Sequence, residues 1–104
     1  MGRSSTVAKR IKQARKLAGL SQQDLGTKAG IEESSASSRI SQYERGVHAP
    51  DFETAERLAE TLRIPLPFLY AADDALAAWI LAFSKVSLSV RKEVIRKAGP
   101  AEDV

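Results

Sequence analysis

The sequence predicts an all-α fold. Apolar residues recur three and four positions apart along most of the chain, which is the spacing of one helix face, and Gly and Pro separate these segments. No stretch alternates apolar and polar residues for long enough to form a strand of a sheet. With 104 residues, of which 43% are hydrophobic, the chain has the size and apolar content of one small domain with a single core.

The first helix is expected to begin after a cap at Ser5 or Thr6 and to end at Gly19. The residues that the spacing places on its buried face are Val7, Ile11, Ala14 and either Leu17 or Ala18. Its basic residues are then left on the face that meets water.

A second, short helix is expected to follow Ser21 as its cap. Asp24 at the third helical position completes a start that resembles a capping box and suits the positive end of the helix dipole. Leu25 and Ala29 face inward, and Gly30 breaks the helix.

A third helix is predicted after Gly30, and it ends at Gly46. Its buried stripe has spacings of four and three, and the residues are Ala36, Ile40 and Tyr43. The residues between these three are polar or charged. A short capped helix, a turn with glycine and a helix with a small, polar outer face form a pair suited to a DNA groove.

The fourth helix is expected to follow the Ala49-Pro50 turn with Asp51 as its cap. The residues predicted on its core face are Phe52, Ala55, Leu58, Ala59 and Leu62. Ile64-Pro65-Leu66-Pro67 then forces an extended link, because the residue before a proline avoids helical backbone. A short fifth helix follows around Phe68, Leu69 and Tyr70.

Residues 75 to 86 are apolar at ten of twelve positions, which is too apolar for a helix that exposes one side to water. This segment therefore needs a second burial partner. A last helix is expected from Ser87 or Ser89 to Ala98, with Leu88, Val90, Val94 and Ile95 facing inward. The tail after Gly99-Pro100 is expected to be flexible.

The distribution of charge indicates a polyanionic partner. The formal net charge is only +3, but every ionic residue before Asp24 is basic, namely Arg3, Lys9, Arg10, Lys12, Arg15 and Lys16. A solvated basic helix with no target is the alternative.

Several classes of function are disfavoured by composition. Cysteine is absent and the one histidine, His48, has no second ligand nearby, so neither disulfides nor a metal site is expected. No phosphate-binding glycine loop or nucleophile and base arrangement is present, so the protein is not expected to be an enzyme or to use a cofactor. No apolar run reaches the roughly 18 residues of a membrane span, and we expect a cytoplasmic protein.

Several motifs in register resemble one family. They are Leu20-Ser21-Gln22-Gln23-x-Leu25, Ala29-Gly30-Ile31, Ile40-Ser41, Glu44-x-Gly46, Pro50 and Leu58-Ala59-x-x-Leu62. Over roughly residues 7 to 71 the chain is similar to the Cro/C1-type (XRE) helix-turn-helix regulators. With its C-terminal extension, it most resembles the restriction-modification controller proteins and small phage repressors among them.

The resemblance implies a lambda-repressor-like five-helix DNA-binding domain in residues 1 to 72. Residues 73 to 98 would then form a helical extension for dimerisation within the same globule, and residues 99 to 104 a flexible tail. It also implies a dimeric transcription regulator whose third helix enters the major groove while the second lies across it.

The chain departs from the family pattern between Gly30 and Ile40, where Glu32-Glu33-Ser34-Ser35 are additional. Four residues are about one helical turn. We therefore predict that the recognition helix is longer at its start, with Ser37, Ser38, Arg39 and Gln42 still facing the same way. The alternative is a longer turn.

The resemblance assigns candidate DNA contacts residue by residue. Base-reading side chains fall at Ser37, Ser38 and Gln42, with Arg39 beside them. The guanidinium of Arg39 suits the O6 and N7 acceptors of guanine, and Gln42 suits adenine. A phosphate contact or an intramolecular bond is the alternative for Arg39, and simple solubility of the helix is the alternative for the serines.

Other residues match positions near the DNA backbone or in the scaffold. Gln22 resembles the family glutamine that bonds a phosphate and props the recognition helix. The remaining backbone candidates, each of which is equally a solvated surface residue, are Arg10, Lys12, Arg45 and His48. Arg15 and Glu44 match a structural ion pair that joins the first helix to the end of the third.

A homodimer on an inverted-repeat operator is expected, with an interface formed by Leu76, Trp79, Ile80 and Phe83. Trp79 is alternatively an ordinary core residue, and the fifth helix could supply the contact instead. The rival function is that of an antitoxin, in which the apolar C-terminal surface binds a toxin while the same helix-turn-helix represses the shared promoter.

Overall fold

The computed structural model describes the backbone of residues 2 to 99 and the side chains from Thr6 onward. The predicted flexible tail lies largely outside the described residues. Within them the fold is all-α, as predicted, with no strand. The elements are α1 (Gly2–Leu17), α2 (Gln22–Lys28), α3 (Glu33–Glu44), α4 (Phe52–Leu62), the 3₁₀ helix η1 (Leu66–Tyr70), α5 (Asp74–Lys85) and α6 (Leu88–Ala98).

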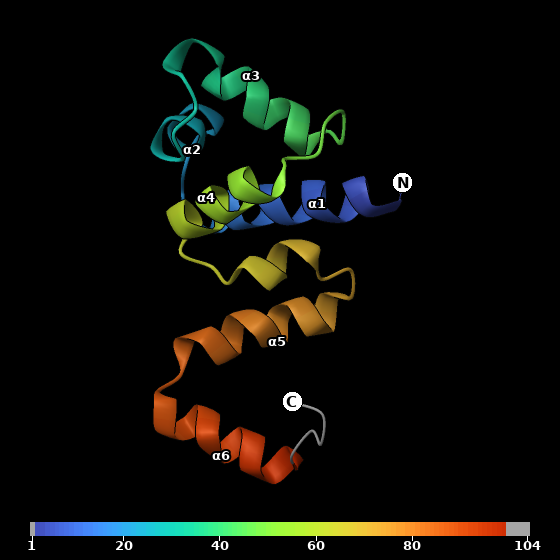
Figure 1. Cartoon of the computed structure of the whole chain (residues 1–104), viewed down its shortest axis with the longest axis vertical. Coiled ribbons are helices and arrows are strands. Elements are labelled where there is room, and N and C mark those ends of the chain that lie inside the picture. Colours follow the sequence, from blue (N-terminus) through green and yellow to red (C-terminus); the bar gives the residue numbers. More distant parts are fainter. Residues whose placement is uncertain (1, 100–104) are drawn as a thin grey trace.

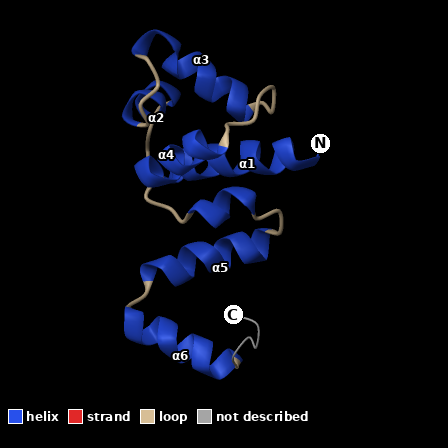
Figure 2. Ribbon diagram, in the orientation of Figure 1, coloured by secondary structure: helices blue, strands red, loops and turns tan. Residues whose placement is uncertain are grey.

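The described part of the chain is elongated, with principal extents of 48 × 28 × 21 Å. Its helices follow one another along the long axis (Figure 1). The α2–α3 pair lies at one end, α1 and α4 come next, and η1, α5 and α6 continue to the other end. Figure 2 shows that short loops join these helices. The order leaves α3 at one end of the molecule and α6 at the opposite end.

The core lies between α1, α2, α3, α4 and η1. Each of these elements supplies at least one fully buried side chain, among them Ile11, Leu25, Ile40, Leu58 and Phe68. Burying a side chain of this size contributes roughly 1.5–3 kcal/mol, so this shared core holds the five elements together. The predicted caps of α2 and α4 are present, since Ser21 accepts a hydrogen bond from the backbone of Asp24 and Asp51 accepts one from the backbone of Thr54.

Two predictions at helix ends were wrong. Helix α1 begins at Gly2 rather than after Ser5 or Thr6, because the small polar residues there are tolerated within a helix and nothing breaks it. Leu17 and Ala18, the two alternatives for the last buried position, are both exposed, since the chain turns away at Gly19 (φ 71°) and Leu20 packs against the core in their place.

Phe52 corrects the predicted core face of α4. As the first residue of the helix it lies outside the part that packs on the core, and it is exposed. The remaining predicted residues of that face, Ala55, Leu58, Ala59 and Leu62, are buried.

The four additional residues do lengthen α3. Glu32 is the N-cap and the helix runs from Glu33 for 12 residues. The longer helix crosses α2 closely at Gly26, where an added Cβ would lie 2.6 Å from the Cβ of Ala36 and 2.9 Å from its Cα. No side chain fits at this crossing, so the absence of a Cβ at Gly26 permits the position of α3.

The two C-terminal helices are poorly buried within one chain. Only Ala77 of α5 is buried, and α6 has no buried residue. The prediction that Leu88, Val90 and Ile95 face inward is therefore wrong for the single chain, because beyond α6 the described chain offers nothing to cover them. Their apolar surface faces solvent.

Candidate DNA-binding surface

Helix α3 is fixed by one face and presents the other. Ala36, Ile40 and Tyr43 are buried in the scaffold, whereas Ser37 and Ser38 are exposed. Ser38 donates to the carbonyl of Ser35 at 3.2 Å, which leaves its oxygen free to accept further hydrogen bonds. The scaffold therefore holds a small, polar helix surface outward at the end of the molecule (Figure 1).

Arg39 and Gln42 lie beside this surface, on the flank of α3 that faces the loop before α4. Arg39 is exposed and Gln42 is half-buried, and both line a hollow of ≈ 470 Å³ together with His48. The structure thus brings a guanidinium, an amide and an imidazole to one rim of the helix. These groups can donate hydrogen bonds to base edges or to phosphate oxygens.

The end of α3 is tied to α1 by the predicted ion pair. Nε of Arg15 lies 2.6 Å from Oε2 of Glu44, and its Nη2 lies 3.0 Å from Oε1. The side chains are 12% and 4% exposed, and Arg15 also donates to the carbonyl of Leu20 at 3.0 Å. The hydrogen bonds that Arg15 donates to the Glu44 carboxylate raise the pKa of Arg15 above its ordinary value. The pair fixes α3 to α1 at the C-terminal end of α3.

Gln22 joins the same network. Its Nε2 donates to Oε1 of Glu44 at 3.2 Å, so the first residue of α2 is connected to the last residue of α3. The structure supports the predicted propping of the recognition helix by this residue. One amide hydrogen of Gln22 and its oxygen are left for another partner.

The other backbone candidates divide into two groups. Lys12, Arg45 and His48 are exposed, and Nε of Arg45 donates to the hydroxyl of Ser41 at 3.2 Å. Arg10 is only 1% exposed, so the prediction that it contacts a phosphate is wrong. Its guanidinium bonds groups of the same chain, which leaves no face for DNA.

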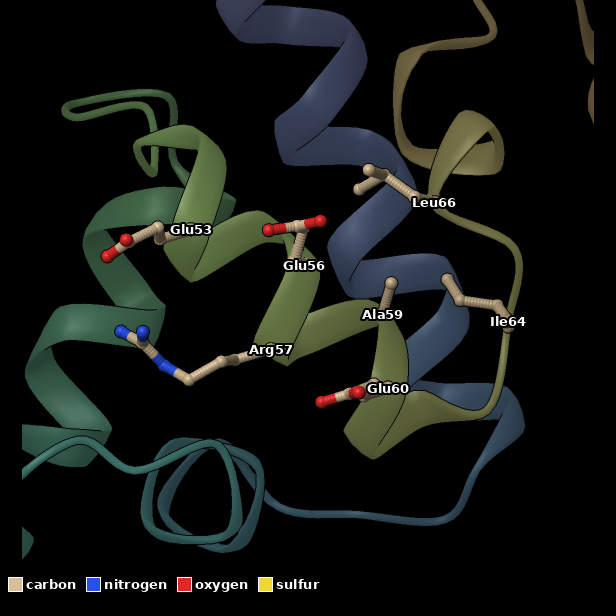
Figure 3. Close-up of a pocket in the computed structure, with 7 residues that line it drawn as sticks. All are labelled: Glu53, Glu56, Arg57, Ala59, Glu60, Ile64 and Leu66. Atoms are coloured by element: carbon tan, nitrogen blue, oxygen red, sulfur yellow. The ribbon is translucent and has the colours of Figure 1, made fainter.

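Sequence reasoning missed Arg57. Figure 3 shows its side chain extending from α4 toward α3, and its Nε donates to the carbonyl of Ala29 at 3.1 Å. Ala29 is the C-cap of α2, so this bond holds the turn between α2 and α3. The sequence shows that Arg57 lies off the apolar face of α4. An arginine at such a position can equally bond a carbonyl or be solvated, so the bond to Ala29 could not be predicted.

The exposed face of α4 carries several acidic side chains, in contrast to the basic residues near α3. Glu53, Glu56 and Glu60 line a shallow hollow of ≈ 400 Å³ with Ile64 and Leu66 (Figure 3). Carboxylates repel the phosphate backbone, so this face is not suited to DNA. Across the described residues, no three His, Cys, Asp or Glu side chains are grouped to hold a metal ion, and no helix is long and apolar enough to cross a membrane.

The predicted dimer residues lie on the outside of α5. Trp79 is 55% exposed, Leu76 is also exposed, and Ile80 and Phe83 are half-buried. Trp79, Ile80 and Phe83 border an apolar hollow of ≈ 520 Å³ whose other lining residues include Pro65, Pro67, Val94 and Ile95. Helix α6 thus supplies part of the lining of this hollow.

Comparison with known proteins defines the class. The model of a helix-turn-helix family, HTH_3, matches residues 11–69, which is more than half of the chain. The chain therefore belongs to the Cro/C1-type (XRE) helix-turn-helix family of DNA-binding transcription regulators, which confirms the predicted membership.

Among solved structures, the chain is similar to the one titled transcriptional regulator BswR. The two share 43% sequence identity with a TM-score of 0.84, and the match covers 88% of this chain and 90% of that one. The likeness thus extends through most of the C-terminal helices. No curated protein matches the sequence.

Proposed function

We propose that the protein is a sequence-specific transcriptional regulator that binds an inverted-repeat operator as a homodimer. The observation that carries this proposal is the division of α3 into a buried face and an outward polar face. A helix held in this way can enter a major groove, about 12 Å wide, without changing its own packing.

Within this proposal, Ser37, Ser38, Arg39 and Gln42 read base edges. Gln22, Lys12, Arg45 and His48 contact the backbone, with the N-terminus of α2 directed at a phosphate. The basic residues of α1 and α3 supply the electrostatic part of the affinity, and the acidic face of α4 turns away from the duplex.

The dimer is proposed to form through α5 and α6. Trp79 and Ile95 are 55% and 57% exposed, and Leu76, Leu88 and Val90 also present apolar side chains. Trp79 and Ile95 also line one apolar hollow, and exposed apolar side chains that gather in this way favour an interface. A two-fold axis at this end would leave both copies of α3 free to face successive major grooves, about 34 Å apart.

Selection of bound fragments from random DNA tests the proposal. The expected product is an inverted repeat whose half-sites are one helical turn apart, with affinity that falls steeply as salt rises because counterions are released. A single half-site without a repeat would contradict the dimer. The absence of any enriched sequence, together with a flat salt response, would contradict specific DNA binding.

The context within the family is a finer part of the proposal. A restriction-modification controller protein fits the DNA-binding helix pair and a self-associating C-terminus. The antitoxin alternative is favoured by the same exposed apolar face of α5 and α6, which a toxin would cover instead of a second copy. The mass of the purified protein in solution separates the two, since a dimer supports the first and a monomer that pairs with a neighbouring gene product supports the second.

A further inference from the structure

Arg10 of α1 is a buried charged side chain whose nitrogens are all engaged. Its Nε donates to the carbonyl of Ala71 at 2.8 Å, and its Nη2 donates to the carbonyl of Ala72 at 3.2 Å and to Oδ1 of Asp74 at 3.0 Å. Its Nη1 donates to Oε1 of Gln13 at 2.9 Å. The guanidinium also lies over the Phe68 ring, 5.5 Å from the centroid.

Three of the four oxygens that Arg10 bonds lie in one place, and the fourth belongs to Gln13 of α1. Ala71 and Ala72 belong to the link between η1 and α5, and Asp74 is the first residue of α5. These partners are 61 to 64 residues from Arg10 in sequence. One side chain of the DNA-binding part therefore holds the place from which α5 and α6 leave it.

Apolar packing alone would fix poorly the direction in which α5 leaves the DNA-binding part. Ala77 is the one buried residue of α5, and Ile80 and Leu81 only partly cover the core. Hydrophobic contacts are non-directional, so they allow a helix to roll on its support. A planar guanidinium with donors in a fixed fork sets an orientation, because its hydrogen bonds require particular angles.

We propose that Arg10 is a positioning residue that sets the operator spacing the protein accepts. It fixes the angle between the helix-turn-helix and the α5–α6 arm, and this angle determines how far apart the two recognition helices lie in the dimer. The inference rests on the proposed dimer through α5 and α6. Arg10 acts through the link and not by contact with DNA.

The first test measures the arm without DNA. The chain has no cysteine, so spin labels at Ser38→Cys and Ser89→Cys report the distance between α3 and α6 in full-length protein diluted with unlabelled chains. Arg10→Met and Asp74→Asn should each broaden the distance distribution relative to the parent. Asp74→Asn removes the negative charge from one exposed partner of Arg10 and is not expected to disturb the core, while Glu60→Gln serves as the matched control.

The second test measures spacing preference. Duplexes carry the selected half-sites at separations changed one base pair at a time. The parent and Glu60→Gln should favour one separation by about tenfold. Arg10→Met and Asp74→Asn, the two clamp variants, should lose most of that preference while keeping their affinity for a single half-site. Unchanged distance distributions in the clamp variants overturn the inference, as does a retained spacing preference. A parent that binds no inverted repeat shows instead that the proposed dimeric function has failed.

Discussion

At the scale of single residues, the structure separates charged groups that hold the scaffold from those that face outward. Arg10 and Arg15 are largely covered and bond carbonyls or carboxylates of the same chain, whereas Arg39 on α3 and its C-cap Arg45 are exposed. Arg57 is exposed as well, but it bonds the carbonyl of Ala29. Sequence reasoning could predict Arg15, because its partner stands at a recognisable family position. It misplaced Arg10, because a basic residue on an amphipathic helix is usually solvated. Most of the partners of Arg10 lie in the link after η1 and at the start of α5, far from it in the sequence.

Glu44→Ala should destabilise the fold by about 3 kcal/mol, because it leaves Arg15 without its carboxylate in a mostly buried position. Chemical denaturation of the variant measures this loss. Glu56→Ala, at an exposed position on α4, is the control and should change stability little. Equal stability of the two variants would show that the ion pair does not hold α3.

Arg39→Ala should leave stability unchanged, since the side chain is exposed, and reduce discrimination against altered operators by about 1–3 kcal/mol. Titration of the protein with the selected duplex and with single-base variants measures this. Arg96→Ala on α6 controls for loss of charge alone. A uniform loss of affinity for all sequences would make Arg39 a phosphate contact.

Asp74 gives a pH dependence. Hydrogen bonds from Lys9 and Arg10 lower the pKa of its carboxyl below the ordinary value, so its contribution to stability is present above about pH 4 and is lost as the pH falls through the lowered pKa. Asp74→Asn should therefore be less stable than the parent at pH 7, with the difference shrinking at pH values below 4. A difference that is the same at both pH values would contradict this account of the link.

At the scale of elements, the sequence predicted the presence of the helices better than it predicted which of their residues are buried. The caps at Ser21 and Asp51 could be predicted because they depend on neighbouring residues. The longer start of α3 could be predicted because the four residues additional to the family pattern amount to about one helical turn. The start of α1 could not, since its polar residues favour both a cap and a helix. The predicted burial of Phe52 and Leu17 was wrong. Periodicity shows which face of a helix is apolar, but it does not show how far along that face other elements cover the helix.

Gly26→Ala tests the crossing of α2 and α3. An added Cβ would meet Ala36 at 2.6 Å, so we expect a loss of about 1–3 kcal/mol through overpacking and a weaker affinity for DNA. Thermal unfolding and operator titration measure the two effects. Thr27→Ala, the exposed neighbour on the same helix, should be close to neutral. A stable Gly26→Ala variant with full affinity would show that this contact does not position the recognition helix.

At the scale of the whole molecule, α3 lies at one end and the exposed apolar surface of α5 and α6 at the other (Figure 1). This separation suits the proposed regulator, in which one end binds DNA and the other end binds a second copy of the chain. The excess of apolar residues in 75 to 86 predicted a second burial partner, and the single chain leaves that surface open. Sequence alone could not show how far α6 lies from the core, because this depends on the link that Arg10 holds.

DNA binding through α3 is tested by titrating isotopically labelled protein with the selected operator duplex and following the chemical shifts of its backbone amides. We expect the largest shift changes on residues 33 to 48 and at the start of α2, with little change along α4 at Glu53, Glu56 and Glu60. Shift changes centred on that acidic face, or on α5 and α6 with α3 unaffected, would show that α3 does not bind the operator.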